Sequence, residues 1–327
     1  MTSPSAASSA RAADAAASAS APSTETRRTP STRRFRQVDV FGADAFAGNP
    51  LAVVVDADGL SDEQMQRIAS WTNLSETSFL LAPTRPGADY RVRIFTPSTE
   101  LDFAGHPTLG SAFAWLAAQA DGGEATGSAD ERILVQECRA GLVEVRVDGD
   151  DLAFAAPPLV RSGPMDADHL ADAAAALGID PADVLDHAWV DNGAGWCVLE
   201  LASAQDVLDL EPDLAVIPGR KIGALGAVGA TADAPTTGAD GPAYEVRGFV
   251  APDPVSGTPG YEDPVTGSLN AGIAQWMLER GRFAPPWTVR QGTRLGRHGR
   301  VLVDVDAEGT IWIGGTVRTG IQGEILV

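Results

Sequence analysis

Two short stretches, Ala104-Gly105-His106-Pro107-Thr108-Leu109-Gly110-Ser111 and Glu262-Asp263-Pro264-Val265-Thr266-Gly267-Ser268, decide the fold of this chain. Each is rich in Gly, Pro and hydroxyl or ionisable side chains, and each runs into an apolar, helix-compatible segment, at 112–116 and 269–278. Because proline lacks the N–H group that a first helical turn leaves unpaired, both stretches predict helix N-termini. Such ends hold carboxylates well. Two of them, far apart in the chain, predict a duplicated architecture with one site between the halves.

Composition narrows the class of partner. The chain has 327 residues and a formal charge of −20, with 44 acidic against 24 basic residues. This balance repels a phosphate backbone and argues against nucleic-acid binding, although a local cluster of N–H donors can still hold a small anion. No apolar run approaches the length of a membrane span, so we expect no membrane association.

Cysteine and histidine usage argues against disulfides and metal sites. Cys138 and Cys197 are the only cysteines, which predicts a reducing, cytoplasmic setting. The four histidines show no metal-ligand spacing, and no G-x-G-x-x-G or P-loop motif is present. We therefore expect neither a metal nor a cofactor.

The order of predicted elements favours an α+β fold of two similar domains. Residues 1–34 hold almost only Ala, Ser, Thr, Pro and Arg, which predicts a disordered tail, with an organellar transit segment as the alternative. Pro157-Pro158 marks a boundary between a domain at 35–156 and one at 157–327, with the return of the last strand to the first domain as an alternative. Each domain is expected to wrap a curved sheet or barrel around one central helix.

Helices are predicted after a Ser61 cap, after each of the two opening stretches, at 167–177 and at 206–210, and residues 122–130 and 229–243 are predicted to be loops. The predicted strands lie at 36–41, 51–55, 78–82, 90–96, 133–136, 142–147, 152–155, 196–201, 244–250, 301–305, 310–314 and 321–327.

Four ionisable or hydroxyl side chains are candidates for chemistry. Glu76 lies between a predicted helix and a strand beside apolar residues that would raise its pKa, or it is a surface glutamate. His106 begins a helix as a neutral imidazole, or it is a structural histidine. Asp263 and Ser268 belong to the second helix entrance, where an N-cap and a filled first turn are the structural alternatives.

Taken together, the motifs resemble one family, the PhzF or phenazine-biosynthesis isomerase-like proteins, which share the diaminopimelate epimerase-like fold. The resemblance covers about residues 36–327. It is carried by the segments Val38–Phe41, Gly48–Val53, Leu74–Thr77, Arg93–Pro97, Glu100–Thr108, Glu262–Ser268, Gln291-Gly292 and Gly296-Arg297.

The resemblance implies roles at matching positions. Glu76 would be the general acid/base, His106 would hydrogen-bond the reacting molecule, and Asp263 would orient Glu76 or the substrate. The resemblance further implies a homodimer, no cofactor and a small carboxylate-bearing substrate. The residues implied to bind that substrate are Gly105, Thr266, Gly267 and Ser268.

These motifs favour a cofactor-independent isomerase, since one carboxyl can remove and return a proton. Two alternatives stay open, a non-catalytic small-molecule binding protein on the same fold and an epimerase or racemase of an amino-acid-like substrate. The two-cysteine chemistry of related epimerases is not expected, because neither helix entrance contains a cysteine. Leu269 and Asn270 depart from the residues common in the family, so the pocket and substrate can differ.

Overall fold

A computed structural model describes residues 31–121, 132–149, 151–229, 241–255, 257–282 and 284–327. The chain divides into a unit at Met1–Ser31 and a unit at Thr32–Val327, and the following concerns the second unit. The loop predicted at 122–130, most of the loop predicted at 229–243 and most of the predicted tail lie outside the described residues.

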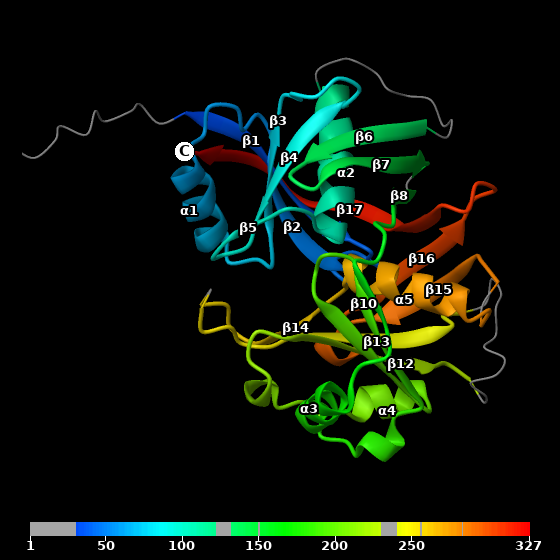
Figure 1. The fold of residues 1–327 in the computed structure, drawn as a ribbon. Helices are drawn as coiled ribbons and strands as arrows, with labels where there is room; N and C mark the ends of the chain where they lie inside the picture. Colours follow the sequence, from blue (N-terminus) through cyan, green and yellow to red (C-terminus); the bar gives the residue numbers. More distant parts are fainter. Residues whose placement is uncertain (1–30, 122–131, 150, 230–240, 256, 283) are drawn as a thin grey trace, which may run out of the picture. The chain divides into compact units, whose positions relative to one another are not determined.

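The helices are few and the strands many (Figure 1). The helices are α1 (Asp62–Thr72), α2 (Gly105–Asp121), α3 (Ala167–Leu177), α4 (Ala204–Asp209) and α5 (Gly267–Glu279). The strands of the first half are β1 (Thr32–Val40), β2 (Asn49–Val54), β3 (Thr77–Leu81), β4 (Tyr90–Phe95), β5 (Glu100–Leu101), β6 (Arg132–Cys138), β7 (Gly141–Asp148) and β8 (Asp151–Ala155). Those of the second half are β9 (Arg161–Gly163), β10 (Asp186–Asp191), β11 (Trp196–Leu201), β12 (Lys221–Ala227), β13 (Tyr244–Val250), β14 (Tyr261–Asp263), β15 (Trp287–Gln291), β16 (Gly299–Val305) and β17 (Ile311–Leu326).

Strand pairing in the first half closes on itself. The ring runs β1, β2, β3, β4, β6, β7, β8, β17 and back to β1, with β2–β3 and β4–β6 parallel and the other pairs antiparallel. Helix α2 packs against strands of this ring. Its residues Gly105 to Ala112 are all buried, as expected of a helix enclosed by a sheet.

The second half repeats the theme with an open order, β9, β10, β11, β12, β13, β15, β16 and β17. Here α5 packs against β10, β11, β16 and β17. The predicted α+β class is therefore confirmed, with one central helix to each half.

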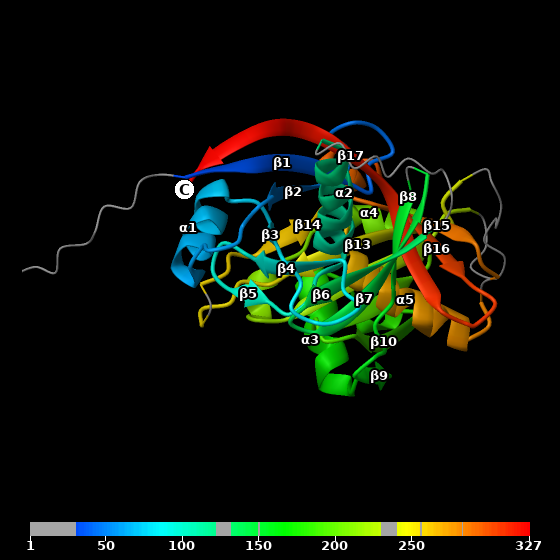
Figure 2. The same cartoon turned by 90° about the horizontal axis from the view of Figure 1, so that it is seen from above.

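Strand β17 joins the two halves. Its start pairs with β16 and β8, and its remainder pairs with β1, beside which it runs in Figure 2. The sequence predicted two strands here, at 310–314 and 321–327. That prediction was wrong, because one strand runs through both segments: Gly315 pairs with β8, and Gly320 lies at an irregularity within the pairing with β1. The domain boundary at Pro157-Pro158 stays a prediction.

Local signals set several of the elements. Ser61 caps α1 through a reciprocal capping box with Gln64, as the sequence predicts. Asn73 ends the helix in the left-handed conformation, at φ 54°, which asparagine tolerates. The chain then turns into β3, and Glu76 lies in this connection. At the other end of the unit, β1 begins at Thr32, so the last residues of the predicted tail belong to a strand.

Candidate active site

The two predicted helix N-termini meet backbone to backbone. A Cβ atom built on Gly105 would lie 2.8 Å from the Cα atom of Gly267, and one built on Gly267 would lie 3.0 Å from the Cα atom of Gly105. Only glycine allows this approach. The first residues of α2 and α5 are therefore in contact, and the partial positive charges of both helices converge at one place.

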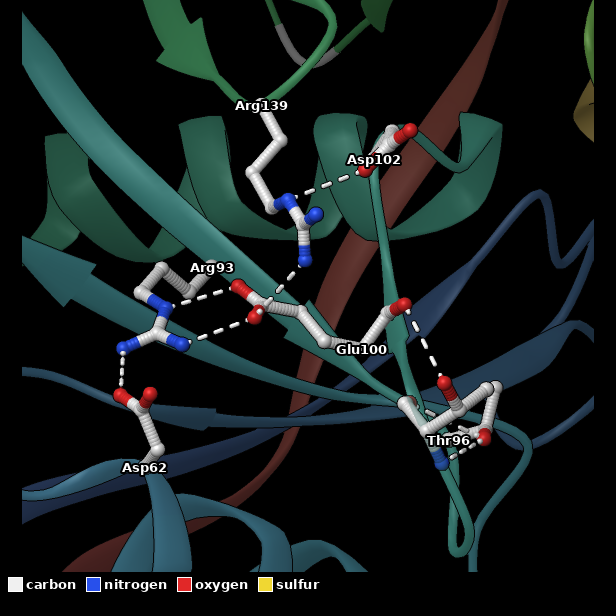
Figure 3. A network of polar contacts seen from close by, with 7 residues as sticks. Asp62, Arg93, Thr96, Glu100, Asp102 and Arg139 are labelled. Atoms are coloured by element: carbon white, nitrogen blue, oxygen red, sulfur yellow. Dashed lines mark hydrogen bonds and ion pairs between the residues drawn. The ribbon is translucent and has the colours of Figure 1, made fainter.

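A network of ion pairs holds the arm that leads into α2 (Figure 3). The Arg93 guanidinium of β4 donates to both carboxylate oxygens of Glu100 on β5, at 2.7 and 2.8 Å, and to Asp62 at 2.6 Å. Arg139 bridges Glu100 and Asp102, at 3.2 and 3.0 Å. Because Glu100 and Asp102 precede the first turn of α2, these bonds fix the strand from which His106 is presented.

Glu76 and His106 face each other. Glu76 Oε2 lies 3.3 Å from His106 Nε2, and the two side chains are 12% and 5% exposed. The contact lacks hydrogen-bond geometry, so both buried atoms are without a hydrogen-bond partner among the described residues. A carboxylate oxygen and an imidazole nitrogen thus face one another, and each keeps its hydrogen-bonding capacity for a reacting group.

Asn49 defines the protonation of His106. The Asn49 Nδ2 group lies 3.3 Å from His106 Nδ1. An amide NH₂ cannot accept a hydrogen bond, so it favours the tautomer with an unprotonated Nδ1 and with the imidazole proton on Nε2, toward Glu76. Burial lowers the pKa of His106 to about 3, which keeps the ring neutral at physiological pH. His106 can therefore donate a hydrogen bond without carrying charge.

Asp263 completes the acidic pair. It lies on β14, where Oδ1 accepts from Asn49 at 2.8 Å and Oδ2 accepts from Thr266 at 2.7 Å. Burial raises its pKa to about 6 against these two bonds. Burial, together with the charge of Asp263, raises the pKa of Glu76 to about 8. At neutral pH the pair holds one readily transferable proton.

The N-cap of α5 is Thr266, so the alternative that Asp263 caps this helix was wrong. The Thr266 hydroxyl gives the helix no cap bond, because it donates to Asp263 and accepts from Gln291 at 2.9 Å. Gln291 also accepts from the Thr266 backbone N–H and from Asn270. This network fixes the position of Asp263 relative to α5.

Ser268 accepts two hydrogen bonds from side chains outside α5. Its hydroxyl oxygen accepts from the Trp196 indole N–H at 3.0 Å, and its carbonyl accepts from Asn192 at 2.8 Å. The hydroxyl proton is left to donate elsewhere. The structure thus brings Glu76, His106 and Asp263 together through Asn49, with Ser268 at the start of the adjoining helix.

A cavity of about 340 Å³ lies next to the connection that carries Glu76, although Glu76 itself does not line it. Ser75 and Tyr261 line it, and the hydroxyls of Ser98 and Thr258 approach to 3.4 Å at its rim. Burial raises the pKa of Tyr261, and the charges of Asp263 and Glu76 raise it further. The cavity is therefore lined by a side chain, Tyr261, whose pKa depends on the charges of both carboxyl groups.

Neither cysteine belongs to this arrangement. Both are free, and burial raises the pKa of the Cys138 thiol and raises that of Cys197 to about 12. Both thiols stay protonated at neutral pH and are poor nucleophiles. In the described part of the chain no group of His, Cys, Asp or Glu side chains could hold a metal ion. No helix within those residues is long and apolar enough to cross a membrane.

Sequence reasoning missed two residues of this region. Asn49 stands in the Gly48–Val53 segment, but no local signal reveals its long-range partners. Lys221, at the start of β12, acts electrostatically on Glu76 and Asp263 and lowers the pKa of each. Here a signal existed, because Lys221 is the only lysine of the chain.

Comparison with solved structures defines the class. The chain superimposes on the PhzF-family phenazine biosynthesis protein of Bacillus anthracis with a TM-score of 0.72 and 25% identity, covering 91% of this chain and 100% of that chain. The predicted epimerase-like fold is confirmed by this and similar neighbours. The family model described as "Phenazine biosynthesis-like protein" matches residues 38–323, and the chain belongs to this family.

Two curated relatives bear on the activity. Antisense-enhancing sequence 1 of Schizosaccharomyces pombe is 37% identical over 310 residues, or 90% of this chain and 98% of that protein. Trans-2,3-dihydro-3-hydroxyanthranilate isomerase of Pseudomonas aeruginosa is 52% identical over 88 residues, or 27% of this chain and 31% of that protein. Further relatives that match over most of their length are named isomerases, and the chain is an isomerase of this family.

Proposed function

We propose that this protein is a cofactor-independent isomerase that relocates a proton between two carbon atoms of a small carboxylate-bearing molecule, with Glu76 as general acid/base. One observation carries the proposal. Glu76 Oε2 is buried, faces His106 Nε2 at 3.3 Å and has no hydrogen-bond partner among the described residues. A carboxyl kept in this state with a pKa of about 8 is suited to proton transfer near neutrality.

In this proposal the Glu76 carboxylate removes a proton from a C–H bond. The electron pair moves into the adjoining π-system, and the Nε2–H of neutral His106 donates to the oxygen or nitrogen that gains charge. Protonated Glu76, whose proton exchanges with solvent, then delivers a proton to another carbon on the same face, so that substrate and product are isomers. General acid/base transfer of this kind contributes roughly 10²–10⁴ in rate.

Asp263 tunes the pKa of Glu76. Its negative charge raises the pKa of Glu76. Its own position is fixed by Asn49 and Thr266, so the distance between the two carboxyls is set by the framework and not by the substrate. Asp263 is thus a positioning and pKa-tuning residue in this proposal.

The substrate is proposed to reach Glu76 through the cavity beside Ser75 and Tyr261, with its carboxylate at Ser268 and the first turn of α5. Leu269 and Asn270 are 0% and 1% exposed, and Asn270 bonds Thr266 and Gln291. These departures from the common family residues therefore act on the framework beneath the pocket. The relatives' substrate, trans-2,3-dihydro-3-hydroxyanthranilate, is a reasonable first compound to test.

The test is proton exchange in D₂O. Wild type is expected to convert trans-2,3-dihydro-3-hydroxyanthranilate or a related cyclic carboxylate with deuterium uptake at the receiving carbon, and Glu76→Gln to lose at least about 10²-fold in rate. Glu63→Gln, at an exposed position of α1, is the control. Equal exchange by E76Q and wild type would refute the assignment.

Other outcomes identify the alternatives. Saturable ligand binding without exchange across a panel of cyclic carboxylates would favour a binding protein. Inversion at one carbon, seen by chiral chromatography of the product, would favour an epimerase. The homodimer and the cytoplasmic setting expected from the sequence stay predictions, to be checked by analytical ultracentrifugation and by fractionation.

A further inference from the structure

The chain carries 24 basic residues, and Lys221 is the only lysine among them. All the other residues in this count are arginines. At every other position that requires a basic side chain, the chain therefore uses arginine. Lysine differs from arginine in being a compact, strongly hydrated point charge.

Strand register places Lys221 beside the proposed site. On adjacent strands β11 to β14, Trp196, Lys221, Val250 and Tyr261 form one row across the sheet. Tyr261 at the end of this row lines the cavity next to Glu76.

The next row, two residues along, holds Gly223, Gly248 and Asp263. A Cβ on Gly223 would lie 2.7 Å from Leu269, and one on Gly248 would lie 2.9 Å from the Thr266 hydroxyl. The start of α5 thus covers the glycine row, and the Lys221 row borders it.

Lys221 and Ser268 are linked through one side chain. The Lys221 ammonium lies 5.8 Å from the centroid of the Trp196 ring, and the same indole donates its N–H to the Ser268 hydroxyl. Trp196 is buried, at 2% exposed. A rigid aromatic side chain therefore spaces a cation and a hydroxyl donor along one wall.

Two of the three carboxyl groups near Lys221 accept hydrogen bonds from other donors. Both oxygens of Asp263 accept hydrogen bonds from Asn49 and Thr266. Asp191 accepts the backbone N–H groups of Gly193 and Gly195.

Glu76, the third neighbouring acid, is largely protonated at neutral pH because its pKa is about 8. Among the residues described, the Lys221 ammonium forms no ion pair or hydrogen bond: it lies over the Trp196 ring and interacts with Glu76, Asp263 and Asp191 only through its charge, at longer range. A cation held in this way is ready for an external anion.

We propose that Lys221 binds the substrate carboxylate, which lies between the Lys221 ammonium and the Ser268 hydroxyl, and that it restricts the enzyme to anionic substrates. This deepens the proposed function and rests on it. The ammonium also stabilises the negative charge that spreads toward the carboxylate when the neighbouring carbon loses its proton.

The only lysine allows a direct measurement on the full-length protein. Reductive methylation with ¹³C-formaldehyde labels Lys221 and the N-terminal amine alone, and Lys221→Arg identifies the Lys221 signal. The probes are 2-aminobenzoate and its uncharged counterpart, 2-aminobenzamide. We expect a saturable shift of the Lys221 resonance with 2-aminobenzoate and no shift with 2-aminobenzamide. No shift with the carboxylate, or equal shifts with both probes, overturns the proposal.

Calorimetry with the same probes tests the energy of the contact. Lys221→Met is expected to weaken 2-aminobenzoate binding about 10- to 100-fold, the usual effect of losing a hydrogen bond to a charged group, and to leave 2-aminobenzamide binding within about twofold. Arg220→Met is the matched control, because the neighbouring Arg220 is partly exposed and pairs with Asp172. Unchanged carboxylate binding by K221M, or an equal loss for both probes, contradicts the proposal and indicates a structural role.

The Glu76→Gln variant separates this inference from the function on which it rests. If E76Q keeps the carboxylate-dependent shift, carboxylate binding by Lys221 stands whether or not wild type exchanges protons. If wild type exchanges protons and K221M has the same KM and rate, the isomerase assignment stands and the role of Lys221 is refuted.

Discussion

Asn49 at the start of β2 donates a hydrogen bond to Asp263 of β14 at 2.8 Å, and this contact joins the two halves of the molecule at the candidate site. The same Nδ2 group also donates to the Val265 carbonyl at 3.0 Å and faces His106 Nδ1. One amide therefore sets the tautomer of His106 and the position of Asp263. The geometry of the site therefore depends on how the two halves are placed relative to each other.

Replacing Asn49→Ala should uncouple the two halves at the site. We expect a loss of about 2–4 kcal/mol of unfolding free energy, because buried acceptors are left unsatisfied. The pKa of Asp263 should rise, since the Asn49 bond lowers it. Urea unfolding measures the stability, an NMR pH titration of Asp263 measures its pKa, and proton exchange in D₂O measures the activity, with the exposed Gln205→Ala as control. Wild-type exchange rates in N49A would show that the coupling is dispensable.

The pH dependence of turnover follows from Glu76. Proton removal requires the ionised carboxyl, and burial raises its pKa to about 8. The value of kcat/KM should therefore rise about tenfold per pH unit from pH 6 toward 8 and level off above. Neutral His106, with its pKa of about 3, adds no limb in this range. A rate that is flat between pH 5 and 8 would show that another group removes the proton.

Local sequence signals predicted most elements because their causes are local. Helix α3 and strands β11 and β13 begin and end at the predicted residues, since caps and apolar runs define them. Strand β12, with the sequence Lys-Ile-Gly-Ala-Leu-Gly-Ala, was missed because its glycines and alanines carry no strand propensity. Those small residues are required by α5 and by the Ser203 backbone, which pack against β12 from elsewhere in the chain.

In the candidate site too, some features follow from local sequence signals and others from contacts between distant segments. The helix entrances and the residues they carry follow from Gly, Pro and hydroxyl patterns, and the resemblance to a family singled out Glu76. The partnership of Asn49 with Asp263 and the row that holds Lys221 depend on strand register between distant segments. Register is decided by packing of the whole sheet, which no short motif encodes.

Stability should change with pH in the opposite sense to activity. Glu76 binds its proton more tightly in the folded protein, with its pKa raised from the ordinary 4.5 of a glutamate to about 8. The folded state therefore loses stability as pH rises through this window, by up to about 1.4 kcal/mol per pH unit. Glu76→Gln cannot ionise, so its unfolding free energy should gain on wild type between pH 5 and 8. Urea titrations at each pH test this, and parallel curves for the two proteins would contradict it.

The contact between Gly105 and Gly267 makes the last prediction, since it joins the two helix N-termini. Alanine at 105 would favour the helix by about 1 kcal/mol in open surroundings. Here its Cβ would lie 2.8 Å from the Gly267 Cα and 3.0 Å from the Phe154 ring, and the backbone atoms cannot turn aside. We expect Gly105→Ala to cost about 1–3 kcal/mol and to displace His106 from Glu76, so that exchange falls with stability. Gly241→Ala, at a glycine with no neighbour within 4 Å of the added Cβ, should leave both unchanged. A G105A protein with wild-type exchange and unfolding would mean that the helices can separate without disturbing the site.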